Sequence, residues 1–278
     1  MSIDLHAQGA ADGNPAARAG TTTRQSPSST RDLNGRVAIV TGAARNIGRA
    51  IAVALGRQGA HVVVNVRGSF DEAERTADLV FEAGGKAFVH AADVTDPDAV
   101  RGLIDAAVAG FGGIDILVNN AAIRKEAAFE ALDWAQWRAV TGVILDGAYL
   151  CTHAATPYLK QSEAGAIVNI GGMSAHAGSA GRAHVIAAKL GLVGLTRALA
   201  CDLGEFGITA NCVVPGLIDT VRGASAQGEP AHHGRHRTLL GRRGEAQEVA
   251  DLVAFLCGPK ARYLTGQYMH ANGGAFLG

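Results

Sequence analysis

The chain has 278 residues, of which 37 are glycine, and its 25 lysine and arginine residues balance its 25 aspartate and glutamate residues. A net charge of zero provides no electrostatic footprint for nucleic acid or an anionic membrane surface. A glycine share of about 13%, without many prolines or a G-X-Y period, excludes collagen and low-complexity sequence. It indicates tight turns and close backbone contacts.

The first 34 residues are rich in Gly, Ala, Ser and Thr and contain no apolar segment that suits a secretory signal. We therefore expect a disordered tail over residues 1–34. No window approaches 18 uninterrupted apolar residues, so a transmembrane helix is not expected. The four cysteines lack metal-ligand spacing and lie in apolar runs, which favours buried, reduced thiols in a cytoplasmic protein.

Short β-branched runs alternate with helical stretches from Arg36 onward, as in βαβ units with a parallel sheet buried on both faces. The predicted strands span residues 36–41, 61–66, 86–90, 114–119, 166–170, 208–214 and 267–270. A helix should begin after an Asp96 N-cap, with Pro97 at its first position, and run towards Gly110. Segments 133–161 and 183–205 should form long helices on the sheet.

A glycine-rich turn follows the first predicted strand. It reads Thr41-Gly42-Ala43-Ala44-Arg45-Asn46-Ile47-Gly48 and leads into a helical stretch. Such a turn lets backbone N–H groups and the helix dipole meet a pyrophosphate. The sequence therefore predicts a single-domain α/β Rossmann fold over residues 35–278, with a doubly wound, seven-stranded parallel sheet and helices on both faces.

This turn resembles the TGxxxGxG fingerprint of the short-chain dehydrogenase/reductase family, with Asn46 in place of the second glycine. Asparagine tolerates a left-handed backbone, so the turn should survive the replacement. Further matches follow in order within residues 34–278: Asp93-Val94, Asn119-Asn120-Ala121-Ala122, Pro215-Gly216-Leu217-Ile218-Asp219-Thr220, and Leu264-Thr265-Gly266-Gln267 leading to Asn272-Gly273-Gly274.

The resemblance implies a nicotinamide dinucleotide cofactor. Asp93 would contact the adenine, Asn119 would brace the fourth strand beside the cofactor, and Thr220 would meet the nicotinamide carboxamide. For Asp93 and Asn119 the alternative is ordinary turn chemistry at strand ends. The residues expected at the cofactor are Gly42, Arg45, Asn46, Ile47, Gly48, Arg67, Asp93, Val94, Asn119, Lys189, Pro215, Gly216, Ile218 and Thr220.

The end of the second strand bears on the choice of dinucleotide, because no carboxylate stands there before Asp71. NAD-selective Rossmann domains use an acidic residue at this point to hold the ribose 2′-hydroxyl. Arg67 and Arg45 suit a 2′-phosphate instead, since arginine offers paired donors in a fixed fork. The sequence favours NADP(H), with NAD(H) and two merely solvated arginines as the alternatives.

The family's usual catalytic groups are an asparagine, a serine and a YxxxK pair, and this chain matches only the lysine, as Lys189. Ile144, Gly172 and Val185 stand at the other three positions. Valine cannot transfer a proton, so the usual tyrosine mechanism is not expected. In the family the lysine also bonds the nicotinamide ribose, so Lys189 supports cofactor binding as well as chemistry.

Three nearby side chains are candidates to replace the missing proton donor: Ser174, His176 and His184. Histidine is the usual general acid or base near neutral pH. Adjacent helical residues project about 100° apart, so His184 would face the pocket only if its helix began late or irregularly. A structural role is the alternative for each.

A polar, basic and glycine-rich insertion at about 221–244 is expected to form a substrate lid. Its run His232-His233-Gly234-Arg235-His236-Arg237 suits an anionic substrate or a solvated surface, and no metal site is expected because carboxylate and cysteine partners are missing.

The resulting expectation is a cytoplasmic NADP(H)-dependent oxidoreductase that transfers hydride to or from a small carbonyl, alcohol or imine substrate. The alternatives are a non-redox lyase or isomerase and an NADP(H)-binding regulatory protein. The resemblance implies a homodimer or homotetramer, and neither a nucleic acid nor a membrane partner is expected.

Overall fold

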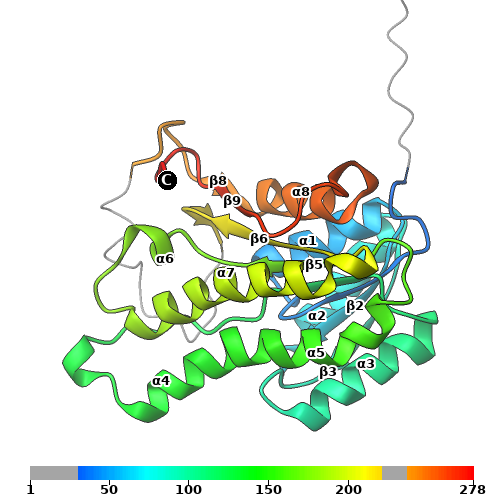
Figure 1. Ribbon diagram of the computed structural model, residues 1–278, viewed down its shortest axis with the longest axis horizontal. Coiled ribbons are helices and arrows are strands. Elements are labelled where there is room, and N and C mark those ends of the chain that lie inside the picture. Colours follow the sequence, from blue (N-terminus) through cyan, green and yellow to red (C-terminus); the bar gives the residue numbers. More distant parts are fainter. Residues whose placement is uncertain (1–30, 221–236) are drawn as a thin grey trace, which may run out of the picture. The chain divides into compact units, whose positions relative to one another are not determined.

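A seven-stranded parallel sheet lies at the centre of the fold, in the order β3-β2-β1-β4-β5-β6-β9 (Figure 1). The computed structural model describes residues 31–220 and 237–278. Its sheet strands are β1 (Val37–Val40), β2 (His61–Val66), β3 (Lys86–Ala91), β4 (Ile116–Asn119), β5 (Ala166–Ile170), β6 (Thr209–Pro215) and β9 (Tyr268–Ala271). Every neighbouring pair is parallel, which confirms the predicted fold class.

Helices cover both faces of this sheet, which explains why the central strands are apolar throughout rather than alternating. Strands β1, β4, β5 and β6 are buried at every residue. In β1, Ala38 and Val40 pack into one core and Ile39 into the other, because successive strand residues point to opposite faces.

The first core is shared by α1 (Asn46–Arg57), α2 (Phe70–Glu82) and α8 (Ala246–Cys257). The second includes side chains of α3 (Pro97–Phe111) and α5 (Gly147–Leu159). Helix α7 (Ala183–Leu203) packs against β6 and against α4 (Trp134–Thr141). Short elements complete the described chain: η1 (Phe129–Ala131), α6 (Ser174–Ala177), η3 (Gly204–Phe206), β7 (Ile218–Asp219), β8 (Gly244–Glu245) and η5 (Pro259–Ala261).

The predicted start of α3 is confirmed. Asp96 is the N-cap, its side chain accepts hydrogen bonds from the backbone N–H groups of Asp98 and Ala99, and Pro97 is the first helical residue. The single long helix expected over 133–161 is instead divided, because the π-helix η2 (Gly142–Asp146) separates α4 from α5. A π-turn of this kind is frequent near functional sites.

The segment Ala183–Phe206 is long and apolar enough to cross a membrane by length and composition alone. In the structure it contributes Val185, Ala188 and Leu192 to a hydrophobic cluster with residues of α4, η2 and α5. This packing accounts for the apolar residues on one face of the segment, and 39% of its most apolar window is buried.

Two expectations are corrected at this level. The tail expected over 1–34 is too long, since Leu33 is fully buried in the first core and its N–H bonds the carbonyl of Gln58 at 3.0 Å. The cysteines are not all buried: Cys201 is exposed because it lies on the solvent side of α7, whereas Cys151, Cys212 and Cys257 are buried. All four are free thiols.

Residues 221–236 of the expected lid lie outside the described residues, and they include most of its histidine-rich run. The chain is described again from Arg237, and β8 then pairs in parallel with β7. Arg243 forms an ion pair with Asp219 at 2.7 Å, so the two ends of the insertion are held side by side.

Candidate cofactor and active site

The sequence-predicted site residues gather where the parallel strands end. Gly42 follows β1, Asn119 ends β4, Gly172 follows β5 and Gly216 follows β6. Strand β1 lies between β2 and β4, so the direction of the chain's progress across the sheet reverses there. Ligands of open α/β sheets bind at such a switch point, outside the carboxyl ends of the strands.

The glycine-rich turn adopts the backbone that the sequence predicts. Asn46 has φ +53° and, among the described residues, is the one non-glycine residue with a positive φ. Gly42 has φ +63°, and a Cβ there would lie 2.9 Å from Ala121 Cα. A Cβ on Gly48 would overlap the Gly42 carbonyl and lie 2.6 Å from Asn120 Nδ2. Both glycines are required by close packing inside the turn.

A set of hydrogen bonds ties this turn to the end of β4. Thr41 Oγ1 accepts from the N–H groups of Asn120 and Ala121, each at 3.0 Å, and Asn120 Nδ2 donates to the carbonyls of Thr41 at 2.9 Å and Gly42 at 3.0 Å. Thr41 and Asn120 were not among the expected site residues. The signal that points to them is the second asparagine of the Asn119-Asn120 pair.

The start of α1 suits an anion. Arg45 precedes the helix, no side chain caps it, and its first turn has no acidic residue. Its first N–H groups and the positive end of its dipole therefore face the turn without a competing carboxylate cap. These features fit the pyrophosphate of a dinucleotide.

Asn46 offers a direct test of this turn. Asn46→Val should lower the free energy of unfolding by about 1–3 kcal/mol, because a β-branched residue is strained at positive φ. Asn46→Gly relieves that strain and should stay close to the parent protein, and urea denaturation measures both. An equal loss in the two variants would contradict the backbone explanation.

Of the two arginines expected at a 2′-phosphate, Arg45 directly precedes α1 and Arg67 lies between β2 and α2, and each already has an acidic partner. Arg45 Nη1 is 3.2 Å from Glu72 Oε2, and Arg67 Nη1 is 3.6 Å from Asp93 Oδ2. Burial would raise the pKa of Asp93, but hydrogen bonds from Thr95 and the charge of Arg67 outweigh it and lower that pKa. A phosphate here would have to share these arginines with carboxylates.

Asn119 lies in a buried polar network. Its Nδ2 donates to Thr152 Oγ1 at 3.1 Å and to Asn169 Oδ1 at 2.9 Å, and Asn169 Nδ2 donates to Thr196 Oγ1 at 2.9 Å. The network joins β4 and β5 to α5 and α7. Breaking a buried network of this kind leaves an unsatisfied polar group, so it holds the ends of both strands firmly in register.

Most of the remaining residues expected at the cofactor are buried. Ile47, Val94, Pro215 and Ile218 are buried. Thr220 is half-buried and is the last described residue before the insertion. Gly216 is required by a close approach, because a Cβ there would lie 2.6 Å from Asn272 Cα.

Lys189 is 8% exposed, and its ammonium donates to the carbonyl of Ile170 at the end of β5. Burial lowers its pKa from 10.5 to about 7, and the charges of Arg124 and Arg182 act in the same direction against the opposing effect of Cys212. A group with a pKa near 7 can both give and take a proton at neutral pH.

The residues that the sequence places at the family's other catalytic positions differ in their surroundings. Ile144 is 2% exposed and Val185 is 3% exposed, and both belong to one hydrophobic cluster formed by η2, α4, α5 and α7. A Cβ on Gly172, by contrast, would have no atom within 4 Å. The positions expected for the asparagine and the tyrosine are therefore filled by apolar packing, and the position expected for the serine is open.

The three candidate replacements lie on two elements, Ser174 and His176 on α6 and His184 in the first turn of α7. Ser174 is half-buried at the start of α6. His176 packs its ring against C-terminal residues, with centroid distances of 5.2 Å to Tyr268 and 4.7 Å to His270. Burial lowers the pKa of His176.

His184 is fully buried, and neither of its ring nitrogens has a hydrogen-bond partner. Helix α7 begins at Ala183, so the late helix start that would turn His184 onto the face of Val185 is not found. Burial lowers the pKa of His184, and Arg182 and Lys125 lower it further.

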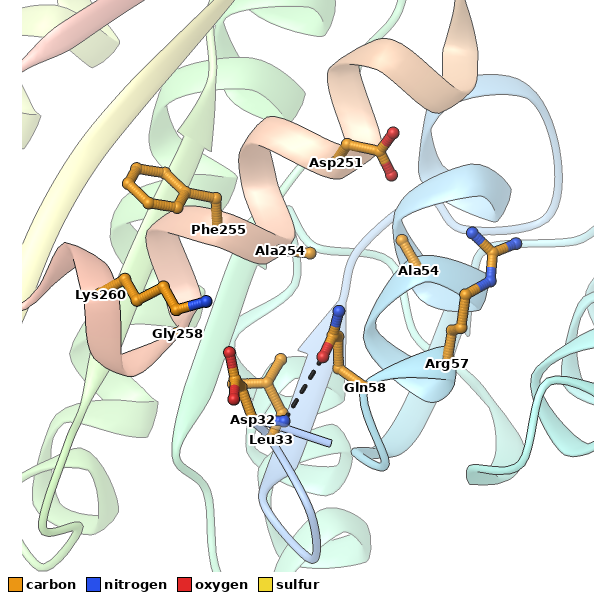
Figure 2. Close-up of a pocket in the computed structure, with 10 residues that line it drawn as sticks. All are labelled: Asp32, Leu33, Ala54, Arg57, Gln58, Asp251, Ala254, Phe255, Gly258 and Lys260. Carbon is orange, nitrogen blue, oxygen red and sulfur yellow. Dashed lines mark hydrogen bonds between the residues drawn. The ribbon is translucent and has the colours of Figure 1, made fainter. Parts of the chain in front are cut away.

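A separate cavity lies between the end of α1 and α8, beside the first described residues of the chain (Figure 2). Its lining includes Asp32, Gln58, Asp251 and Lys260, and Gln58 accepts a hydrogen bond from the N–H of Asp32 at 3.4 Å. It contains none of the expected site residues, and it adjoins the end of α1 opposite the glycine turn. Over residues 31–220 and 237–278, no group of three or more His, Cys, Asp or Glu side chains is placed to hold a metal.

Residues 42–275 match a family model described as enoyl-(acyl carrier protein) reductase. The chain is 37% identical over 240 residues to the 3-oxoacyl-[acyl-carrier-protein] reductase FabG of Staphylococcus aureus, covering 86% of this chain and 98% of the relative. A 3-oxoacyl-[acyl-carrier-protein] reductase of Synechocystis is also 37% identical, covering 88% and 98%.

Solved structures agree with these matches. A dehydrogenase/reductase from Sinorhizobium meliloti has a TM-score of 0.84 at 36% identity, covering 90% of this chain and 98% of that one. A short-chain dehydrogenase from Burkholderia cenocepacia, solved in complex with NADP, has a TM-score of 0.82 at 36% identity, covering 88% and 99%. The chain belongs to the short-chain dehydrogenase/reductase family.

Proposed function

We propose that this protein is an NADP(H)-dependent oxidoreductase that transfers hydride to or from a small carbonyl, alcohol or imine substrate. The observation that carries the proposal is the turn at Gly42–Gly48, where a left-handed Asn46 leads into the uncapped start of α1. The Burkholderia relative solved with NADP and the 3-oxoacyl reductases support it. A bound dinucleotide supplies the hydride chemistry itself.

The chain's own residues bind the dinucleotide and orient it. The start of α1 binds the pyrophosphate, and Arg45 with Arg67 binds a 2′-phosphate. The Asn119 network holds the ends of β4 and β5 in place beside the cofactor. These assignments account for the cofactor without the usual tyrosine.

We assign the proton transfer to Lys189. It is buried at the carboxyl end of β5 with a pKa of about 7, so it is poised to protonate a developing alkoxide. Val185 cannot do so, because it is an apolar side chain packed in a hydrophobic cluster. Ser174, His176 and His184 stay as alternative donors, and a bound water is a fourth.

A second candidate function is NADP(H) binding without turnover, as in a regulatory protein. The apolar packing of Ile144 and Val185 favours it, because the positions of two catalytic groups are closed rather than merely substituted. A lyase or isomerase acting in the same pocket is the non-redox version of this alternative.

We further propose a cytoplasmic homodimer or homotetramer acting on a small molecule. The four free thiols are compatible with a reducing compartment.

Two measurements in sequence test the function. Fluorescence titration with NADPH should show saturable binding, and its absence would defeat both the oxidoreductase and the sensor. A panel of ketones, aldehydes, imines and alcohols followed by NADPH absorbance should then show turnover with at least one class. Binding without turnover across the panel would favour the regulatory candidate.

The dinucleotide preference has its own test. Arg67→Gln and Arg45→Gln should each weaken NADPH binding by about 10-fold to 100-fold, since a charge-assisted hydrogen bond is worth about 1.5–3 kcal/mol. NADH affinity should change little. The matched control is Arg75→Gln, which removes a surface arginine paired with Glu82 on α2. Equal losses for NADH and NADPH would contradict the assignment to the 2′-phosphate.

A further inference from the structure

Aromatic rings from α6 and from the C-terminal part of the chain form a cluster at one end of the fold. The His176 ring on α6 stacks on Tyr268 with a centroid distance of 5.2 Å and meets the His270 ring edge-on at 4.7 Å. The His270 ring also lies 5.3 Å from the ring of Phe276. In Figure 1, α6 and the C-terminus lie at the same end of the fold. The two imidazoles therefore join α6 to the residues that follow β9.

Asn272 closes the turn that follows β9. Its Oδ1 accepts a hydrogen bond from the N–H of Gly274 at 2.8 Å, and its Nδ2 donates to the carbonyl of Phe276 at 2.8 Å. These two bonds fix the orientation of the amide, because the opposite orientation would set donor against donor and acceptor against acceptor. The same Nδ2 lies 3.4 Å from His270 Nδ1, towards which it can only donate. His270 Nδ1 is therefore the acceptor, and the neutral ring carries its proton on Nε2.

Neither imidazole has a suitable place for a second proton. On His270 this proton would go to Nδ1, where it would face the donor Nδ2 of Asn272. The Nε2 atoms of His176 and His270 are both buried, and neither has a hydrogen-bond partner among the residues that the structure describes. A cationic imidazole is a donor at both nitrogens, so charging either ring leaves a buried N–H without an acceptor.

The elements that form the cluster supply no counter-charge. Residues 272–278 contain no charged side chain, and His176 is the one titratable side chain of α6. The neighbouring strand β6 contributes the buried Cys212, and α7 contributes a cation, since Arg197 lies over the Tyr268 ring at 5.4 Å. Burial lowers the pKa of both histidines, and the charge of His176 lowers that of His270 further.

The segment that returns from the insertion packs against the same turn, and its charges are already paired. Arg242 Nη2 lies 2.6 Å from Glu248 Oε1, and Arg243 Nε lies 2.7 Å from Asp219 Oδ1. These two carboxylates are therefore engaged with arginines, and a cationic imidazole would have to compete for them.

The turn closed by Asn272 is bonded to two other parts of the fold. The N–H of Leu240, on the returning segment, donates to the carbonyl of Gly273 at 3.2 Å. The N–H of Gly216, after β6, donates to the carbonyl of Ala271 at 2.9 Å. Opening the turn would therefore free the segment that carries Leu240 and loosen the end of β6.

We propose that His176, His270 and Asn272 form a pH-sensitive latch, which holds residues 272–276 against α6 at neutral pH and releases them in mildly acidic solution. The inference goes beyond the proposed function and does not depend on it. A released imidazole has the ordinary pKa of 6.5, whereas the packed imidazole binds a proton less readily. Release therefore becomes more favourable as the pH falls below about 6.5.

Hydrogen–deuterium exchange of the full chain, read by mass spectrometry at about pH 7.5 and about pH 5.5, tests the latch. Peptides covering residues 272–278 and 238–243 report its opening, and a peptide from α3 reports the rest of the fold. After correction for the intrinsic exchange rate, the opening constant of the first two should rise about 10-fold for each histidine that takes up a proton on release. The opening constant of α3 should stay constant.

Four variants locate the response. His176→Phe and His270→Phe keep an aromatic ring and remove the titrating group, so each should reduce the rise and the double variant should abolish it. Asn272→Asp gives a cationic His270 an acceptor and should also reduce the rise. The matched control is His153→Phe, which changes an exposed histidine on α5 and should keep the full response.

An opening constant that rises no more at residues 272–278 than in α3 would overturn the inference, as would a rise that persists in the double variant. If the double variant does not fold, the two single variants and Asn272→Asp decide the question in the same way. A full response in all three would then overturn the latch.

Discussion

Lys189→Met is expected to lower the turnover number by a factor of about 10²–10⁴, the usual contribution of a general acid. Methionine keeps the length and apolar stem of the side chain and removes its proton and charge. NADPH binding should weaken about 10-fold, because the lysine is also expected at the cofactor. Steady-state kinetics and fluorescence titration measure the two effects separately.

The pH dependence gives a second signature of the same group. Reduction needs the protonated ammonium, whose pKa is about 7, so the rate of reduction should fall as the pH rises through about 7. Alcohol oxidation needs the neutral amine and should show the opposite trend. Both limbs should vanish in Lys189→Met.

The free energy of unfolding should also depend on pH through Lys189, in a direction that its lowered pKa sets. The folded pKa of about 7 lies below the ordinary 10.5, so the unfolded chain binds the proton more readily between these values. The free energy of unfolding should therefore increase as the pH rises from about 7 towards 10.5, and Lys189→Met should remove that increase.

Lys86→Met is the matched control, since Lys86 is an exposed lysine on β3. Its kinetics should equal those of the parent. Full activity in Lys189→Met would show that the proton comes from elsewhere, and Ser174→Ala, His176→Ala and His184→Ala would then identify the source. Three undiminished variants would leave a bound water as the donor.

Val185→Tyr is expected to lower the free energy of unfolding by about 1–3 kcal/mol, the usual result of overpacking a core. Val185 is 3% exposed and shares its cluster with Ile144, so a larger ring has no space. Gly172→Ser is the control, because a Cβ at that position has no atom within 4 Å. It should leave stability unchanged.

Ile144→Asn should also be destabilising alone, by about 1–3 kcal/mol, because it buries an amide without a partner. The double variant Ile144→Asn/Val185→Tyr should lose less unfolding free energy than the sum of the two single losses. The expected coupling is about 0.5–3 kcal/mol, because the new amide and hydroxyl groups then lie in the same cluster. Urea denaturation of the single and double variants measures this. Strictly additive losses would contradict the view that the two apolar residues fill one another's space.

The sequence by itself predicted the elements whose signals are local. The seven strands stand within two residues of their predicted ends, because both faces of a parallel sheet require near-continuous apolar runs. Asp96 caps α3 as its side chain predicts. Asn46 adopts the left-handed backbone that the sequence predicts for it, because asparagine tolerates this conformation.

Only the tertiary structure decided the features that depend on residues far apart in the chain. The burial of Leu33 depends on its packing into a core assembled from distant segments. The exposure of Cys201 depends on which side of α7 faces the sheet. The burial of Val185, at the position expected for the tyrosine, depends on a cluster that includes Ile144, forty-one residues earlier in the chain. The ring contacts of His176 come from the C-terminal strand and the residues after it.

The same reasoning explains the candidate active site. Motif spacing placed Lys189 and the glycine turn, since each depends on a few neighbouring residues. Whether a side chain such as His184 has a partner, and whether Lys189 is buried enough to titrate near neutral pH, depend on every element packed around them. Long-range packing and desolvation are not encoded in any local pattern, so these properties emerge only when the chain is folded.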